Sequence, residues 1–134
     1  MLVNSFGKNI YPTPVENTYL KSPKIEQVFL VGDRQEYITA LIVPSQELLQ
    51  KKFNLPQEFF EIPERFISEP EIVAWVNEDI RSLSNELAKF ERIKHFKLKR
   101  NPFSMEEGEV TPTLKAKRRV IEKKYQREIE ELYQ

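Results

Sequence analysis

Residues 25–43 read Ile25-Glu26-Gln27-Val28-Phe29-Leu30-Val31-Gly32-Asp33-Arg34-Gln35-Glu36-Tyr37-Ile38-Thr39-Ala40-Leu41-Ile42-Val43. Both ends of this stretch are rich in β-branched and aromatic residues, which favour strands, and the polar residues 32–36 between them predict a turn. We therefore expect two strands that pair as an antiparallel hairpin. Because both strands are almost continuously apolar, the sheet should be covered on at least part of both faces.

Short helices are predicted on either side of this hairpin. Before it, Thr13 can cap a helix, with Pro14 at the first helical position and Glu16 completing a capping box. After it, Ser45 is expected to cap a second helix that extends to about Phe53. The sequence does not decide the structure of residues 54–63.

The longest predicted helix spans about residues 69–90 and follows a capping box that starts at Ser68. Its apolar stripe comprises Ile72, Val76, Ile80, Leu83 and Leu87. A strand with one wet face is expected over residues 93–99, and a last helix over about residues 114–133. The buried stripe of that last helix comprises Ile121, Tyr125, Ile129 and Leu132. These elements predict a single α+β domain over residues 1–134, in which a small three-stranded sheet, the hairpin plus one further strand, packs with helices.

Composition narrows the possible functions. The 134 residues have a net charge of +0, so general electrostatic attraction to nucleic acid is not indicated, and we expect no nucleic-acid partner. With 0 cysteines and 1 histidine there is no thiolate or multi-histidine site, and we expect no metal ligands. No apolar run approaches the roughly 20 residues of a membrane-spanning helix, and we expect a cytoplasmic location. The chain also lacks a nucleophile–base pair and a phosphate-binding loop, so by itself it does not look like an enzyme.

One basic segment near the end could carry chemistry. It reads Glu109-Val110-Thr111-Pro112-Thr113-Leu114-Lys115-Ala116-Lys117-Arg118-Arg119. Pro112 restricts its own φ and the residue before it, so Lys115 should be held at a defined place. Cations at a helix start oppose the helix dipole but are well placed to meet a phosphate or carboxylate. The residues expected to support Lys115 at that anion are Thr113, Arg118 and Arg119. The alternative is a solvated face of a surface helix.

A second candidate site is the segment Gly7-Lys8-Asn9, ahead of the first predicted helix. A glycine beside two polar residues lets the backbone approach a ligand closely, although an ordinary loop is the alternative. His95 has no partner at a telling spacing, and we expect it to be exposed or half-buried. Core packing is the expected role of Phe53, Phe59, Phe60, Phe66 and Trp75.

Together these segments resemble a known family. Residues 7–17, Gly7-Lys8-Asn9-Ile10-Tyr11-Pro12-Thr13-Pro14-Val15-Glu16-Asn17, are similar to the segment that opens the small C-terminal domain of adenylate-forming enzymes, in its long-chain acyl-CoA synthetase version. Residues 109–119 resemble the lysine-bearing motif near the end of that domain, and the hairpin residues 28–33 and 41–44 fit between them. The resemblance covers essentially the whole chain in the right order. Two motifs at matching separation are more specific than either motif alone.

The resemblance implies a long-chain fatty acid–CoA ligase, which joins a fatty acid to ATP as an acyl-adenylate, releases diphosphate and transfers the acyl group to CoA. A large N-terminal domain outside this chain would be the partner that binds ATP, Mg and the fatty acid. The small domain would rotate, first inserting Lys115 against carboxylate and α-phosphate oxygens, then bringing Gly7, Lys8 and Asn9 towards the CoA thiol. This chain alone is expected to bind no cofactor stably and to be inactive. Peripheral membrane contact of the parent enzyme stays open.

The resemblance leaves alternatives. The commoner form of the motif has glycine immediately before the lysine, where this chain has Leu114, and Lys117 is a rival for the role of Lys115. An adenylating enzyme for an aryl or amino acid is a further alternative, since the acyl pocket lies outside the chain. The remaining alternative is a stand-alone interaction module whose basic C-terminal helix binds an acidic partner or nucleic acid.

Overall fold

The central sheet has four strands in the order β3-β4-β6-β5, in a computed structural model that describes residues 1–134. Their bounds are β3 (Ile25–Val31), β4 (Ile38–Pro44), β6 (Ile93–Lys99) and β5 (Phe66–Ile67). β3 and β4 form the expected antiparallel hairpin, β6 runs parallel to β4, and β5 runs antiparallel to β6. A separate hairpin pairs β1 (Leu2–Val3) with β2 (Asn9–Ile10). The α+β fold is therefore confirmed, but the sheet has one more strand than predicted.

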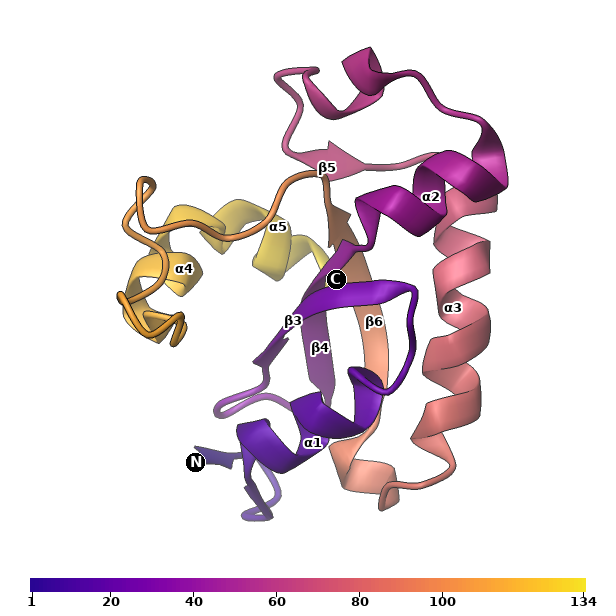
Figure 1. Cartoon of the computed structure of the whole chain (residues 1–134). Coiled ribbons are helices and arrows are strands. Elements are labelled where there is room, and N and C mark those ends of the chain that lie inside the picture. Colours follow the sequence, from indigo (N-terminus) through magenta and orange to yellow (C-terminus); the bar gives the residue numbers. More distant parts are fainter.

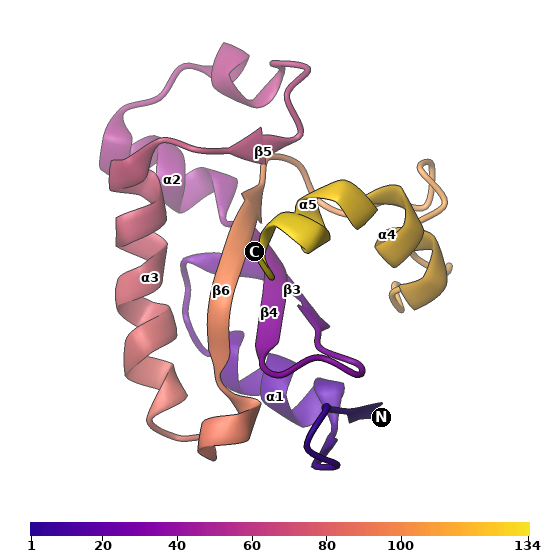
Figure 2. The ribbon, with the colours of Figure 1, turned by 180° about the vertical axis from the view of Figure 1, so that it is seen from behind.

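Helices cover both faces of this sheet, as predicted. On one side lie α1 (Pro12–Tyr19), α2 (Gln46–Phe53) and α3 (Pro70–Ser84), and on the other lie α4 (Arg118–Lys124) and α5 (Gln126–Glu131) (Figure 1; Figure 2, from behind). Alternate strand residues belong to two separate apolar cores. Leu30, Ala40 and Ile42 face the core beneath α1 and α3. Phe29, Val31, Leu41 and Val43 face the core beneath α4 and α5.

The predicted helix starts were partly wrong. Ser45 does cap α2, since its side chain accepts a hydrogen bond from the Leu48 N–H at 3.4 Å. Thr13 and Ser68 cap nothing, because the first helical residues are Pro12 in α1 and Pro70 in α3. A proline fits that position because its missing N–H would have no intrahelical partner there.

The longest helix ends earlier than predicted, at Ser84 rather than near residue 90. The Ser84 hydroxyl donates to Ile80 O at 2.7 Å and lies 2.8 Å from the Tyr19 hydroxyl of α1. Turns and the short 3-10 helix η2 (Lys89–Glu91) then lead into β6. A contact with a residue far away in the sequence thus accompanies the end of α3.

The undecided segment 54–63 contains a second 3-10 helix, η1 (Gln57–Phe60). Arg100, only 2% exposed, holds this segment against the end of β6. Its guanidinium donates to Phe59 O at 2.8 Å, Glu64 O at 2.9 Å and Phe66 O at 3.3 Å. Backbone carbonyls thus satisfy a buried cation that has no carboxylate partner.

The last helix also differs from its prediction. It begins at Arg118 rather than near Leu114, and it is interrupted at Tyr125, where φ is −107° and ψ is 22°. The late start follows from an antiparallel bridge between Val110 and Ala116, which places the preceding residues in a hairpin. The predicted stripe of Ile121, Tyr125, Ile129 and Leu132 is nevertheless buried throughout. Of all the helices, none has the length and apolar character needed to cross a membrane.

Candidate functional site

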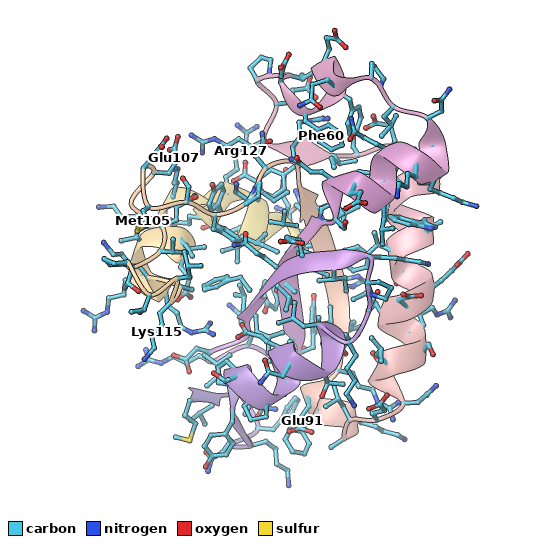
Figure 3. The ribbon with its side chains drawn as sticks, viewed as in Figure 1. Phe60, Glu91, Met105, Glu107, Lys115 and Arg127 are labelled. Carbon is cyan, nitrogen blue, oxygen red and sulfur yellow. The ribbon has the colours of Figure 1, made fainter.

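Lys115 lies on a tightly bonded hairpin that projects from the body of the molecule (Figure 3). The Thr111 N–H donates to Lys115 O at 2.9 Å, and the Leu114 N–H donates to Thr111 O at 2.8 Å. The Thr111 side chain adds a third bond, since its Oγ1 accepts from the Lys115 N–H at 3.1 Å. With the φ of Pro112 also restricted, the backbone at Lys115 is held firmly while its side chain is exposed.

Leu114 adopts a left-handed backbone, with φ at +64°. Glycine occupies such positions without steric cost, whereas a residue with a Cβ does not. This is the position at which the commoner form of the lysine motif has glycine. The hairpin therefore keeps the geometry that a glycine would favour, and it presents a leucine side chain that is 71% exposed.

The hairpin forms one wall of a groove of about 520 Å³. Leu114, Lys115 and Ala116 line this wall, and residues of α1 and β3 line the others. Those residues include Thr13, Glu16, Val28 and Phe29. Lys115 therefore stands beside a partly apolar depression, and its ammonium group has no carboxylate within 4.0 Å.

Lys117 occupies a different place from Lys115. It is the N-cap residue of α4, its N–H donates to Glu109 O at 2.8 Å, and it does not line the groove. Its side chain is exposed, as is that of Arg119. The Thr113 hydroxyl lies 3.0 Å from the hydroxyl of Thr111, so it is engaged within the hairpin.

Arg118 faces a carboxylate of its own chain rather than open solvent. Its Nη2 donates to Glu16 Oε2 at 3.1 Å, and its Nη1 donates to Leu30 O at 2.9 Å. Glu16, predicted to complete a helix cap, instead accepts the Leu30 N–H at 2.9 Å. Burial raises the pKa of the Glu16 carboxyl, while the Leu30 N–H and Arg118 act in the opposite direction.

Glu109 opens the basic segment quoted from the sequence, but the sequence predicted no role for it. Its side chain is 0% exposed and accepts hydrogen bonds from the Tyr125 hydroxyl and from the Ser104 N–H at 3.2 Å. The Lys124 ammonium lies 3.3 Å away. Burial and the bond to Glu109 raise the pKa of Tyr125 well above its ordinary value. Glu109 therefore ties the base of the Lys115 hairpin to α4 and the buried Tyr125.

The second predicted site is the turn between β1 and β2. Gly7 has φ at +80°, with no atom within 4 Å of the place where a Cβ would stand, so backbone conformation rather than space favours glycine. Asn4, also missed from the sequence, organises this turn: its Oδ1 accepts from the N–H groups of Phe6 at 3.0 Å and Lys8 at 2.9 Å. An asparagine just before a glycine turn was the available signal. Lys8 and Asn9 are exposed.

The structure does not place the two predicted loops in one pocket. Residues 7–9 are absent from the lining of the groove at Lys115, and Figure 1 shows the N-terminal hairpin and the 110–116 hairpin as separate projections. The remaining notable residues pack as expected. Trp75 meets Phe53 edge to face at 5.7 Å, and the exposed His95 meets Tyr37 in the same way at 5.7 Å.

Solved structures share this fold. The chain superposes on the adenylation domain of a carboxylate reductase from Mycobacterium chelonae with a TM-score of 0.79 and 22% identity, covering 98% of this chain and 19% of that one. It matches the A-PCP didomain of the carboxylic acid reductase from Segniliparus rugosus, solved with AMP, with a TM-score of 0.77, 22% identity and coverage of 98% and 17%. The fold is therefore one found within enzymes that contain an adenylation domain.

Sequence comparison identifies the family. Residues 1–134 match the family model described as "AMP-binding enzyme C-terminal domain", and the chain belongs to that family. The long-chain-fatty-acid–CoA ligase 5 of Rattus norvegicus is 34% identical over 134 residues, covering 96% of this chain and 19% of that protein. The long-chain-fatty-acid–CoA ligase FadD15 of Mycobacterium tuberculosis is 28% identical, with coverage of 99% and 22%. The chain thus spans about a fifth of the length of these ligases.

Proposed function

We propose that residues 1–134 are the mobile small domain of an ATP-dependent long-chain fatty acid–CoA ligase, and that Lys115 is its adenylation lysine. The observation that carries this proposal is the exposed, unpaired Lys115 at a fixed place on a hairpin, in a chain that belongs to the AMP-binding C-terminal domain family. The fold, the charge of this lysine and the names of the relatives all support the formation of an acyl-CoA through an acyl-adenylate.

In the first half-reaction, a fatty-acid carboxylate oxygen attacks the α-phosphorus of ATP and diphosphate leaves. Negative charge builds up on the phosphate oxygens in this step, and a positioned ammonium group stabilises it. Lys115 can supply that charge because no carboxylate of its own chain neutralises it. A flexible lysine on a rigid hairpin suits a charge that must be delivered and then withdrawn.

In the second half-reaction, the CoA thiolate attacks the acyl carbonyl and AMP leaves. We assign the turn at Gly7, Lys8 and Asn9 to this step, on the strength of the resemblance and of the close backbone approach that Gly7 permits. ATP, Mg and the acyl chain would be held by the large domain. The present chain offers no group of three carboxylate or histidine side chains for a metal.

The decisive experiment uses the intact ligase and measures the two half-reactions separately. Lys115→Ala should lower adenylate formation by about 100- to 1,000-fold, the usual loss for one charge-stabilising group, while supplied acyl-adenylate is still converted to acyl-CoA. Lys117→Ala is the matched control, since it removes an exposed lysine two residues away. Normal adenylation by Lys115→Ala would contradict the assignment, and a selective loss in Lys117→Ala would transfer it to Lys117.

Two other functions have less support. A module that binds nucleic acid through the last helical segment could use its free cations Arg119, Lys123 and Arg127, but the net charge of +0 and the acids that follow, Glu128, Glu130 and Glu131, argue against it. Strong, salt-dependent binding of the chain to DNA would favour that function. Adenylation of a different acid is distinguished by substrate profiling of the intact enzyme, because the acyl pocket lies outside this chain.

A further inference from the structure

The Glu16–Arg118 pair forms a closed network on the outer side of β3. β3 is an edge strand, so the outward N–H and C=O of Leu30 have no strand to pair with. Glu16 Oε2 accepts that N–H at 2.9 Å, and Arg118 Nη1 donates to that C=O at 2.9 Å. Arg118 Nη2 closes the ring on Glu16 Oε2 at 3.1 Å. We call this network the clasp.

The clasp depends on the shape of arginine as well as on its charge. The two guanidinium nitrogens contact different acceptors, and the guanidinium carbon lies 4.8 Å from the centroid of the Phe29 ring. A lysine carries the same charge at a single point and cannot span both acceptors while stacking on the ring. Arg118→Lys therefore breaks the geometry of the clasp and preserves the net charge.

The clasp fixes where the Lys115 hairpin stands relative to the rest of the fold. Arg118 lies three residues after Lys115, and Glu16 lies on α1, on another wall of the same groove. Contacts outside the clasp hold the α4–α5 segment in place and close the hairpin. The α4–α5 segment is anchored by Ile121, Tyr125 and Ile129, and the hairpin is closed by its own backbone bonds. What the clasp adds is the lateral position of the hairpin against α1 and β3.

We propose that Glu16 and Arg118 are positioning residues for the adenylation step, because they hold the hairpin where Lys115 reaches the reacting phosphate. This inference rests on the proposed function of Lys115. Misplacing a catalytic group by about 1 Å can lower a rate about 100-fold, so a loosened hairpin affects chemistry well before it unfolds the chain. The β1–β2 turn is held separately by Asn4, so the thioesterification step should not depend on the clasp.

The test compares Arg118→Lys with Arg127→Lys in the intact ligase. Arg127 is an exposed arginine of α5 that makes no ion pair, so its replacement controls for the substitution itself. Arg118→Lys should lower the kcat of adenylate formation by about 10- to 100-fold, with the KM values for ATP and fatty acid unchanged. Its conversion of supplied acyl-adenylate should stay within about two-fold of the wild type, as both activities should in Arg127→Lys.

A second readout does not depend on activity. Amide hydrogen exchange over residues 109–118 should become faster in Arg118→Lys and stay unchanged in Arg127→Lys, because only the former releases the hairpin from α1 and β3. Glu16→Gln, which keeps an acceptor for the Leu30 N–H, should give a smaller loss of adenylation than Glu16→Ala.

Three results overturn the inference: unchanged adenylation in Arg118→Lys, an equal loss of both half-reactions, or unchanged hydrogen exchange. An equal loss would show a purely structural role. Failure of the proposed function looks different, since Lys115→Ala would then adenylate normally. If Lys115→Ala loses adenylation and Arg118→Lys keeps it, the clasp inference alone is wrong.

Discussion

Replacing Leu114 by glycine should stabilise the chain relative to replacing it by alanine. Both variants remove the same exposed side chain, and they differ only in the Cβ at a position where φ is +64°. A Cβ in the left-handed region costs about 1–2 kcal/mol, whereas the extra freedom of glycine in the unfolded chain costs about 0.5–1 kcal/mol. The free energy of unfolding of Leu114→Gly should therefore exceed that of Leu114→Ala by about 0.5–1 kcal/mol.

The free energy of unfolding of the wild type should lie between those of the two variants or close to that of the alanine variant. The Leu114 side chain is 71% exposed, so truncating it forfeits about 0.5 kcal/mol of burial, a fraction of the roughly 1.5–3 kcal/mol for a fully buried leucine. Urea unfolding followed by circular dichroism measures the difference, which corresponds to a Tm shift of about 2–4 °C.

The matched control is Thr113, the preceding residue, whose φ is not positive. There the order should reverse, with Thr113→Gly less stable than Thr113→Ala, because glycine gains nothing from the backbone and keeps its entropic cost. If Leu114→Gly is no more stable than Leu114→Ala, the left-handed conformation does not carry the strain assigned to it, and the explanation of the glycine in the commoner motif is wrong.

Three further predictions concern other parts of the chain. Tyr19→Phe should lower the free energy of unfolding by about 1–3 kcal/mol, measured by urea titration, because it leaves the buried Ile93 N–H without its acceptor and removes the bond to the Ser84 hydroxyl. The hydrogen bond from Lys124, and the charge of that ammonium, lower the pKa of the Glu107 carboxyl; NMR titration should show this pKa rising towards its ordinary value in Lys124→Met. Gly7→Ala strains a turn where φ is +80°, so in the proposed parent ligase it should slow conversion of supplied acyl-adenylate more than it slows adenylate formation.

The parts of the fold that could be predicted are those specified by neighbouring residues. The hairpin β3–β4 follows from two β-rich runs and a polar turn, and the buried stripe of the last helices follows from helical spacing. The strands that were missed contain only two residues each, as at Phe66–Ile67, so they carry no alternating pattern to recognise. The early end of α3 coincides with contact between Ser84 and Tyr19, residues that are 65 positions apart.

In the candidate site, too, local features could be predicted and contacts between distant residues could not. A motif was enough to select Lys115 as a candidate, but the left-handed backbone at Leu114 was not predicted from it. The role of Glu16 could not be predicted, because its spacing from Thr13 fits a local helix cap while its carboxylate contacts Leu30 and Arg118, 14 and 102 residues further along the chain. A buried carboxylate accepts hydrogen bonds from whichever donors the tertiary fold places beside it. Sequence spacing predicts only donors that lie a few residues away.

The difference between local contacts and contacts with distant residues matters for how Lys115 would act. The local bonds around Thr111 determine the shape of the hairpin, but they cannot determine where the hairpin stands against α1 and β3. The position of the hairpin is instead determined by contacts with distant residues, through Arg118 on the outer side and Glu109 at the base. A substitution that spares the lysine motif can therefore still misplace its ammonium group. Substitutions of Glu16 should therefore lower the proposed adenylation activity as substitutions of Arg118 do, although neither side chain needs to touch the substrate.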